Sequence, residues 1–255
     1  MGLWVKLRIA ARATVLILWT VSLFFFRCLA LLLIPFSRSA EEWCRRMLLR
    51  VWAIGVTWIV RMSLTIEGNA PKPPYYLVTN HLSYLDIVLL ARTAGCVYVS
   101  RSDLADHPVL GFLAKVMNTI FIDRAKARDT HRVNEQINDR LDKGYGVHMF
   151  AESKISQDAQ VHPFKPPLLQ PAIERGIPVH YAALSYSTPP GVPAAKDVIV
   201  WKDGVTLGQN MAHVLGLPKF SAVISYGNAP LTAPDRKELA EKLYLATLER
   251  FTPVD

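Results

Sequence analysis

The sequence has little that would support metal, disulfide or nucleic-acid chemistry. Only three of its 255 residues are cysteines, and Cys28, Cys44 and Cys96 lie too far apart for a metal-ligand pattern. The seven histidines form no H-x3-H or H-E-x-x-H pair, and no nucleic-acid-binding motif is present. We therefore expect free thiols in a reducing compartment, no bound metal or cofactor, and no nucleic-acid partner.

A nucleophile elbow of the form G-x-S-x-G is also missing, which argues against a serine hydrolase of the α/β type. Ser83 does lie two residues after His81, but a Ser-His-Asp triad cannot be packed into the segment from His81 to Asp86. A lipid-binding or scaffold protein without catalysis stays open as an alternative.

Acidic side chains are scarce in the first quarter of the chain. Residues 1–65 contain nine Lys or Arg but only two acids, Glu41 and Glu42, whereas the remaining residues contain 20 basic and 19 acidic side chains. The net charge of +8 is therefore concentrated in the most apolar part of the protein. This combination favours anionic lipid headgroups as the partner.

Charges are almost absent from Thr14 to Phe36, where Arg27 is the single charged residue. The run is long enough to span a bilayer. One arginine near its centre costs about 2.5–3.5 kcal/mol on insertion, which does not exclude spanning. No small-residue cleavage pattern follows the run, so a cleaved signal peptide is not expected.

A second helix is expected over about residues 41–62. Arg46, Arg50, Thr57 and Arg61 fall in one narrow stripe, and most other residues of the helix are apolar. This pattern suits a helix in the membrane interface with its arginines at the headgroups. Packing of this helix on the folded domain is the alternative. We expect residues 1–64 to form a membrane-associated helical hairpin, either spanning the bilayer or resting in one leaflet.

From residue 65 onward, short apolar runs alternate with amphipathic helices, which predicts a layered α/β domain over residues 65–255. The expected strands are 75–79, 97–100, 119–122, 147–150, 179–185, 198–201 and 222–225. The expected helices are 85–92, 109–116, 128–143, 167–174, 207–215 and 235–250. The Pro-rich stretch 71–74 is expected to link the hairpin to the domain.

The segment that most suggests chemistry is Asn80-His81-Leu82-Ser83-Tyr84-Leu85-Asp86, directly after the strand 75–79. His81 and Asp86 can meet only across a turn, and Ser83 offers one because Ser83 to Asp86 matches a capping box. Asp86 can therefore be a helix-capping residue, or it can orient His81 as a general base, and one carboxylate can do both.

This segment resembles the first motif of the glycerolipid acyltransferases, the family of 1-acylglycerol-3-phosphate acyltransferases. Three further blocks resemble later motifs of that family in the same order: Phe121-Ile122-Asp123-Arg124, Phe150-Ala151-Glu152-Ser153-Lys154-Ile155-Ser156 and Ile177-Pro178-Val179. His162-Pro163-Phe164-Lys165 fits the stretch after the third motif. The resemblance covers about residues 65–230 and implies a mixed sheet flanked by helices.

The resemblance implies direct acyl transfer from acyl-CoA or acyl carrier protein to a lysolipid hydroxyl, most simply 1-acylglycerol-3-phosphate to phosphatidic acid. His81 would be the base and Asp86 its partner. Arg124 would bind the acceptor phosphate and Glu152 would lie in the acceptor site. The enzyme would work at the cytoplasmic face of a membrane, the inner membrane in a bacterium, without a metal or cofactor.

The third block departs from the family pattern, because Ala151 replaces proline, Ser153 replaces glycine, and Lys154 and Ile155 replace threonine and, often, arginine. Lys154 or Lys165 would have to supply the positive charge toward the acceptor. A lysolipid with an amino-acid headgroup, as in lyso-ornithine lipid acylation, is therefore an alternative acceptor, and a catalytically weak lipid-binding homologue is another possibility.

Overall fold

The computed structural model describes residues 2–106, 110–123 and 125–255 and places one sheet between two helical layers. The strands are β1 Met62–Glu67, β2 Tyr75–Thr79, β3 Val97–Arg101, β4 Ile120–Ile122, β5 Gly146–Phe150, β6 Val179–Ser187 and β7 Phe220–Tyr226. The helices are α1 Leu3–Ala30, α2 Arg38–Ile59, α3 Leu85–Thr93, α4 Leu110–Val116, α5 Ala127–Asp142, α6 Gln170–Arg175, α7 Ala195–Val198, α8 Leu207–Gly216 and α9 Arg236–Arg250.

The strands follow the order β1-β7-β6-β2-β5-β3-β4 in the sheet. All neighbouring pairs are parallel except β6 and β7, which run antiparallel, so the expected mixed sheet is confirmed. The central strand β2 is buried at all five positions, because helices cover both faces of the sheet. Its sequence is accordingly a continuous run, Tyr75-Tyr76-Leu77-Val78-Thr79, without polar alternation.

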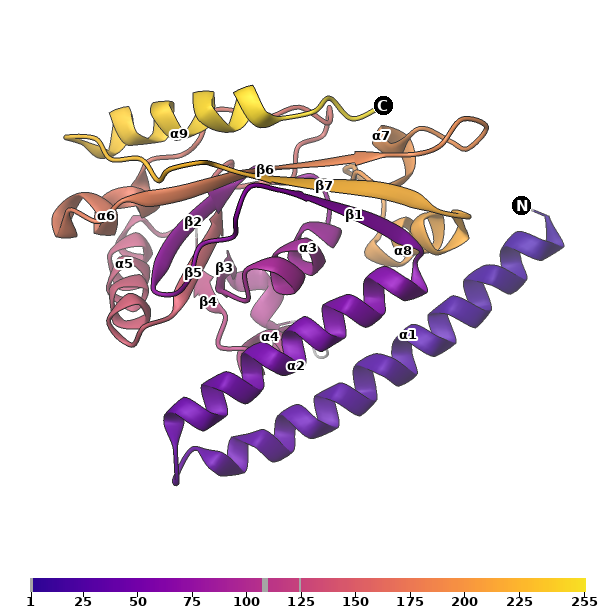
Figure 1. The fold of residues 1–255 in the computed structure, drawn as a ribbon, viewed down its shortest axis with the longest axis horizontal. Helices are drawn as coiled ribbons and strands as arrows, with labels where there is room; N and C mark the ends of the chain where they lie inside the picture. The colour runs from indigo at the N-terminus through magenta and orange to yellow at the C-terminus, as the bar shows by residue number, and fades with distance from the viewer. Residues whose placement is uncertain (1, 107–109, 124) are drawn as a thin grey trace.

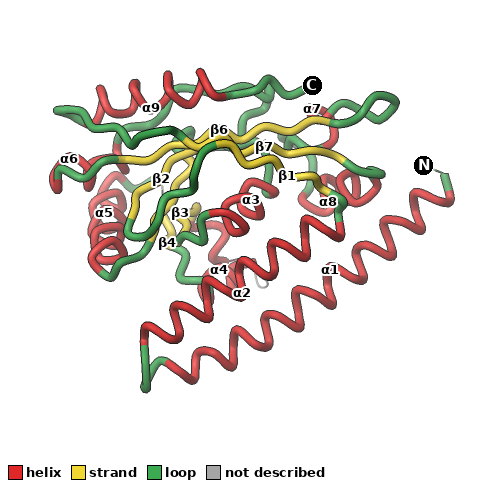
Figure 2. The backbone as a smooth tube through the Cα atoms, viewed as in Figure 1, coloured by secondary structure: helices red, strands yellow, loops and turns green. Residues whose placement is uncertain are grey.

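The two faces of the sheet are covered by different helices, as Figures 1 and 2 show. Buried side chains of α2, α3 and α8 form one core with one face of the sheet, and those of α5, α6 and α9 form a second core on the other face. The site described below therefore lies at an edge of a sheet that is rigidly held from both sides.

The helices α1 and α2 pack antiparallel as a hairpin (Figure 1). Much of α2 lies between α1 and the sheet, and the N-terminal half of α1 also packs on α8, where Arg8 and Arg12 donate to backbone carbonyls at the end of that helix. The indole of Trp19 donates to the carbonyl of Trp52 at 3.2 Å, and the indole of Trp52 donates to the Thr20 hydroxyl at 3.1 Å. Gly55 allows this approach, because a Cβ there would lie only 2.1 Å from the Trp19 indole nitrogen. On its other side α2 contacts α3, where Arg92 donates to the Thr57 hydroxyl.

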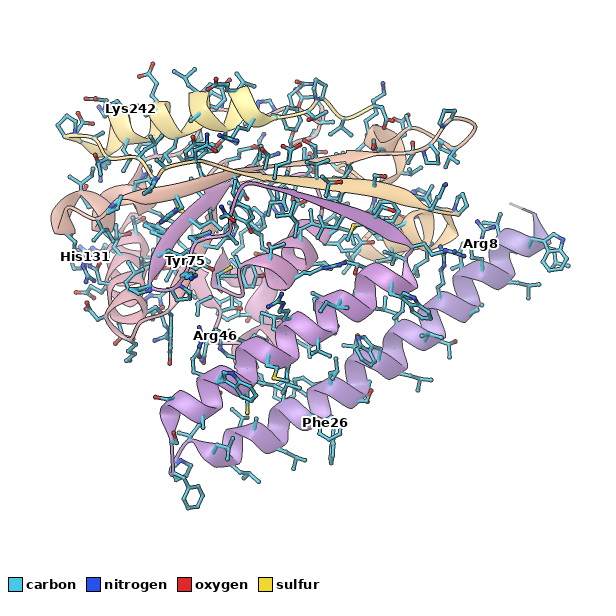
Figure 3. All side chains as sticks on the ribbon, viewed as in Figure 1. Arg8, Phe26, Arg46, Tyr75, His131 and Lys242 are labelled. Atoms are coloured by element: carbon cyan, nitrogen blue, oxygen red, sulfur yellow. The ribbon has the colours of Figure 1, made fainter. Side chains whose placement is uncertain are left out.

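The outward surface of the hairpin is apolar. Large side chains exposed on it include Leu7, Ile17, Leu18, Val21, Phe25, Phe26 and Leu29 of α1, and Trp43, Met47, Ile54 and Trp58 of α2. Figure 3 shows Phe26 pointing away from the rest of the molecule. The continuous helical stretch Leu3–Leu33 is long and apolar enough to cross a membrane by length and composition.

Arg27, the lone charge of the apolar run, faces protein instead of the outward surface. It is 2% exposed, lies 2.5 Å from the Glu41 carboxylate and donates to the carbonyl of Val116 at 2.9 Å. Arg45 of α2 is equally buried and forms a two-point ion pair with Glu42. Arg27 thus fixes the hairpin to the end of α4, and Arg45 adds a long hydrogen bond of 3.4 Å to the carbonyl of Met117 just after it. The helix α2 packs on the folded domain, as in the alternative raised by its sequence.

Three local expectations were wrong. The second helix was expected to end at about residue 62, but α2 ends at Ile59, and Met62 begins an edge strand, β1, that was not expected and that pairs with β7. The apolar run 198–201 forms the end of α7 and a buried turn instead of a strand, with Trp201 N–H donating to the carbonyl of Leu82. The Pro-rich stretch 71–74 connects β1 to β2 and does not join the hairpin to the sheet. The division of the chain at residue 64 stays a prediction.

Candidate active site

The parallel arrangement of β2, β5, β3 and β4 brings their carboxyl ends to one edge of the sheet. Thr79, the last residue of β2, pairs with Phe150, the last residue of β5. The first and third motifs are therefore direct neighbours. The strand β4, which precedes the second motif residue Arg124, lies two positions beyond β5. Such an edge, where loops leave parallel strands, is where α/β proteins bind ligands.

His81 and Asp86 meet across a tight turn. The imidazole Nδ1 lies 2.7 Å from Oδ2 of Asp86, and the same oxygen accepts the backbone N–H groups of Leu82 at 2.7 Å and Ser83 at 3.0 Å. The carboxylate thus holds the turn that precedes α3 and orients the imidazole at once. The Ser83 hydroxyl accepts a long hydrogen bond of 3.4 Å from the N–H of Leu85. The N-cap residue of α3 is Tyr84, which has no side-chain cap, so the fully buried Asp86 carboxylate stabilises the turn before the helix instead of capping the helix itself.

The hydrogen bond to Asp86 sets the tautomer of His81. An ionised carboxylate can only accept, so Nδ1 carries the proton and Nε2 carries the lone pair. The His81 side chain is 16% exposed, whereas Asp86 is fully buried. The face of the imidazole is covered by Phe150, whose ring is stacked at a centroid distance of 3.6 Å and an interplanar angle of 11°. Nε2 is therefore a fixed basic atom at the surface of the sheet edge.

Asn80 holds the backbone just before the histidine. Its amide donates to the carbonyl of Leu184 at 2.9 Å and accepts the N–H of Leu184 at 2.8 Å, and the residue is completely buried. The Thr79 hydroxyl donates to the carbonyl of Asn80 at 2.9 Å, so it must accept from Nε2 of His148 at 3.0 Å. Burial lowers the pKa of His148 well below its usual value, which keeps this second histidine neutral.

Glu152 follows β5 beside His81 and is 4% exposed. Neither carboxylate oxygen has a hydrogen-bond partner within the part of the chain that the structure describes. Burial raises the pKa of Glu152 to about 8. The backbone N–H groups of His162 and His81 are near enough to lower it in part, although neither forms a well-aligned hydrogen bond with the carboxyl group. Burying a carboxyl group without a hydrogen bond costs free energy, so this group is suited to bind a polar atom of a ligand next to the proposed base.

The loop after Glu152 is held against the first motif. Ser156 N–H donates to the carbonyl of His81 at 2.8 Å, and Ser153 adopts a left-handed φ of +71°. Glycine, the usual family residue at this position, adopts that conformation without strain, whereas the same conformation costs free energy for a serine, which has a Cβ. Lys154 and Lys165 are exposed and Ser153 is half-buried. The third motif thus places Glu152 next to His81 and leaves both lysines at the surface.

Arg124 lies outside the described residues. The segment before it is held by two hydrogen bonds to α5. Asp129 accepts the N–H of Asp123 at 2.6 Å, and Arg132 donates to the carbonyl of Phe121. The lysine Lys126 pairs with the carboxylate of Asp123 at 3.0 Å. The role expected for Arg124 stays a prediction.

Comparison with known proteins identifies the segment that contains the candidate site. A family model described as "Acyltransferase" matches residues 61–185. Residues 61–185 therefore belong to the acyltransferase family. This acyltransferase domain contains His81, Asp86 and Glu152 and ends within β6.

Two curated relatives carry different names. A lyso-ornithine lipid O-acyltransferase from Pseudomonas aeruginosa is 29% identical over 159 residues, which cover 62% of this chain and 61% of the relative. A 1-acyl-sn-glycerol-3-phosphate acyltransferase from Neisseria gonorrhoeae is 29% identical over 57% of this chain and 59% of the relative. The matched part thus spans about three fifths of these relatives.

The fold of the acyltransferase domain and its hairpin has a solved counterpart. The crystal structure of the 1-acyl-sn-glycerophosphate (LPA) acyltransferase PlsC from Thermotoga maritima matches with a TM-score of 0.68. At 20% identity the match covers 97% of this chain and 93% of that one, so the likeness concerns the fold.

Proposed function

We propose that this protein is a lysolipid O-acyltransferase that uses His81 as its general base. The observation that carries the proposal is the buried Asp86 carboxylate, which fixes Nδ1 of His81 and leaves Nε2 as a free base inside an acyltransferase domain. A general base needs a fixed lone pair that can reach the hydroxyl it deprotonates.

In the proposed reaction, Nε2 of His81 takes the proton of a lysolipid hydroxyl while the hydroxyl oxygen attacks the carbonyl carbon of a thioester. The new C–O ester bond forms, the C–S bond breaks, and the imidazolium returns the proton to the departing sulfur. Asp86 stabilises the transient imidazolium through the 2.7 Å hydrogen bond. The thioester, acyl-CoA or acyl carrier protein, is part of the proposal.

For the acceptor, we propose a lysolipid whose hydroxyl and neighbouring polar groups lie beside Glu152, the unpartnered carboxyl group next to His81. At neutral pH the raised pKa of about 8 keeps this group mostly protonated, so that it can donate to an acceptor oxygen. With Arg124 as the phosphate ligand and Lys154 or Lys165 as additional cations, the acceptor would be 1-acylglycerol-3-phosphate.

A second acceptor class is favoured by a separate observation. The departures at Ser153, Lys154 and Ile155 change the motif beside Glu152, and a relative named lyso-ornithine lipid O-acyltransferase is as similar to this chain as the glycerolipid enzymes are. An acceptor with an amino-acid headgroup would rely less on an arginine fork for phosphate.

We also propose that the hairpin of α1 and α2 attaches the enzyme to a membrane, with the catalytic edge on the cytoplasmic side. The support is the apolar outward surface of both helices together with the basic excess of residues 1–65. Membrane attachment would bring Nε2 of His81 to lysolipids that remain in the bilayer.

The proposed function is tested by incubating the purified full chain in lipid with a thioester and each lysolipid in turn. His81→Ala should lower kcat by at least about a thousandfold, and His213→Ala, which changes an exposed histidine on α8, should not. Absence of acylation with every lysolipid, or full turnover by His81→Ala, would falsify the proposal.

The same assay separates the acceptor classes. Arg124→Ala should raise the KM for 1-acylglycerol-3-phosphate more than tenfold if a phosphate is bound there. An unchanged KM together with faster turnover of lyso-ornithine lipid would favour the amino-acid headgroup.

A further inference from the structure

The Asp86 carboxylate also receives a hydrogen bond from a side chain 100 positions away in the sequence. Tyr186 of β6 places its hydroxyl 2.6 Å from Oδ1 of Asp86. Because an ionised carboxylate only accepts, the phenol O–H is the donor. The two oxygens of Asp86 thus have different donors: Tyr186 holds Oδ1, and His81 together with two backbone N–H groups holds Oδ2.

The hydrogen bond from Tyr186 restrains the rotation of the Asp86 carboxylate. Rotation about the Cβ–Cγ bond moves both oxygens together, so a donor on Oδ1 opposes any turn that would move Oδ2 away from Nδ1 of His81. The position of Oδ2 in turn orients the imidazole and with it the Nε2 lone pair.

Burial strengthens the interaction. Tyr186 is 1% exposed and Asp86 is fully buried, so the hydrogen bond is charge-assisted and shielded from water. Burial and the neighbouring carboxylate raise the pKa of Tyr186 well above its usual value, so the phenol is protonated at neutral pH and can donate to Asp86.

We propose that Tyr186 is a positioning residue of the acyl-transfer reaction, the outer member of a hydrogen-bonded chain Tyr186–Asp86–His81 that fixes the direction and basicity of Nε2. The proposal rests on the proposed function of His81 as the base. Tyr186 acts through Asp86 and lies one residue beyond the segment that matches the acyltransferase family.

Other ionisable groups face this chain and must be separated from it. The strand β5 contributes the neutral His148, the loop after β5 contributes Glu152 and Asp158, and the N-cap position of α3 contributes Tyr84. Glu152, with a pKa of about 8, titrates in the range where a histidine base would also be studied. A pH–rate profile alone therefore cannot assign a change to His81, and the ring of His81 has to be observed directly.

The experiment is a titration of the His81 ring nitrogens by NMR in the full chain, with the signals assigned by comparison with His81→Gln. Tyr186→Phe removes only the donor to Oδ1, which leaves more of the negative charge of Asp86 available to an imidazolium. The titration midpoint of His81 should therefore move to higher pH by about half a unit, and the acidic limb of kcat should move with it. The KM for the lysolipid should stay within about twofold, because Tyr186 is buried away from substrate, while the plateau kcat should fall about tenfold.

Tyr226→Phe is the matched control. Tyr226 is also 1% exposed, lies on the neighbouring strand β7, and its hydroxyl is 2.6 Å from the uncharged hydroxyl of Thr93. This variant loses the same atom without touching Asp86, so the His81 midpoint should not move. An unmoved midpoint in Tyr186→Phe, or an equal shift in Tyr226→Phe, overturns the proposal.

A second variant keeps the test valid if Tyr186→Phe fails to fold. Site-specific 3-fluorotyrosine at position 186 retains the hydroxyl and is a stronger donor, so the His81 midpoint should move to lower pH. A shift to higher pH, or none, contradicts the proposal. The ring titration needs no turnover. Its result therefore stands even if no lysolipid is acylated, and a failure of the proposed function is distinguishable from a failure of this inference.

Discussion

The side-chain amide of Asn80 bonds to both backbone polar groups of Leu184, at 2.9 and 2.8 Å. The regular pairing of β2 with β6 ends at Thr79 and Ala182. Asn80 therefore continues the β ladder with its side chain just where the backbone must leave the sheet to present His81. The side chain of Asn80 thus links the end of β2 to β6.

Replacing Asn80 by alanine should destabilise the fold and the site together. The substitution leaves the N–H and the carbonyl of Leu184 buried without partners, which costs about 2–4 kcal/mol. The free energy of unfolding in denaturant is the measurement. Asn69→Ala, at an exposed position before β2, is the control and should change it by less than about 0.5 kcal/mol. Equal effects of the two substitutions would contradict this account.

Glu152 should make the protein less stable as the pH rises. Its pKa is raised from 4.5 to about 8 in the folded state, so the unfolded chain ionises first. The contribution of Glu152 to stability is intact below pH 4.5 and is lost progressively up to about pH 8. Glu152→Gln should abolish this loss and gain a few kcal/mol over wild type above pH 8.

Thermal unfolding followed between pH 4.5 and 9 measures this effect. The exposed Glu249→Gln serves as the control, because its carboxylate is already in water. If wild type and Glu152→Gln keep a constant difference in melting temperature across this range, Glu152 does not titrate as the burial requires.

Ser153→Gly should stabilise the protein. The φ of +71° costs a serine more than a glycine, and about 0.5–1 kcal/mol remains after the greater chain entropy of glycine is subtracted. Ser63→Gly, in the extended strand β1, should have the opposite sign. Denaturant midpoints of both variants measure the difference, and a loss of stability in Ser153→Gly would show that the serine side chain contributes more than the strain removes.

The buried pair of Arg27 and Glu41 should show strong coupling. Its two charges approach to 2.5 Å without hydrogen-bond alignment, and Nε and Nη1 of Arg27 have no partner among the described residues. Arg27→Met alone leaves the Glu41 carboxylate buried and should cost about 3–5 kcal/mol, whereas Arg27→Met with Glu41→Leu should be close to neutral. A double-mutant cycle of melting temperatures in detergent measures the coupling, and simple additivity would contradict it.

Much of the fold follows from local patterns in the sequence. The strand 75–79 was predicted with its observed ends, and the expected helices 85–92, 128–143 and 207–215 agree with α3, α5 and α8 to within one residue at each end. The strand is a short continuous apolar run, and the three helices are longer segments with flanking turn residues. The strand β1 alternates apolar and polar residues over Met62–Glu67 and could have been found, but the apolar helix before it masked its start.

Only part of the candidate site could be predicted from local sequence patterns. His81, Ser83 and Asp86 are close in sequence, so their turn and their hydrogen bonds could be foreseen. The partners Leu184 and Tyr186 are about 100 residues away and carry no local signal. The stacking of Phe150 on His81 depends on which strand lies beside β2, and strand order cannot be read from a run of apolar residues.

The hydrogen-bond partners of the first motif are synthesised later than the motif itself, which sets the order in which the site can form during translation. Asn80 bonds to Leu184 and Asp86 bonds to Tyr186, and both partners lie on β6. Thr79 bonds to His148 of β5. The hydrogen bonds around His81 can therefore be completed only after β6 has left the ribosome. The apolar hairpin emerges before β6, because synthesis runs from the N-terminus. If the hairpin attaches to a membrane as proposed, a nascent chain can reach the lipid surface before the hydrogen bonds around His81 have formed, and a chain truncated before β6 would lack them.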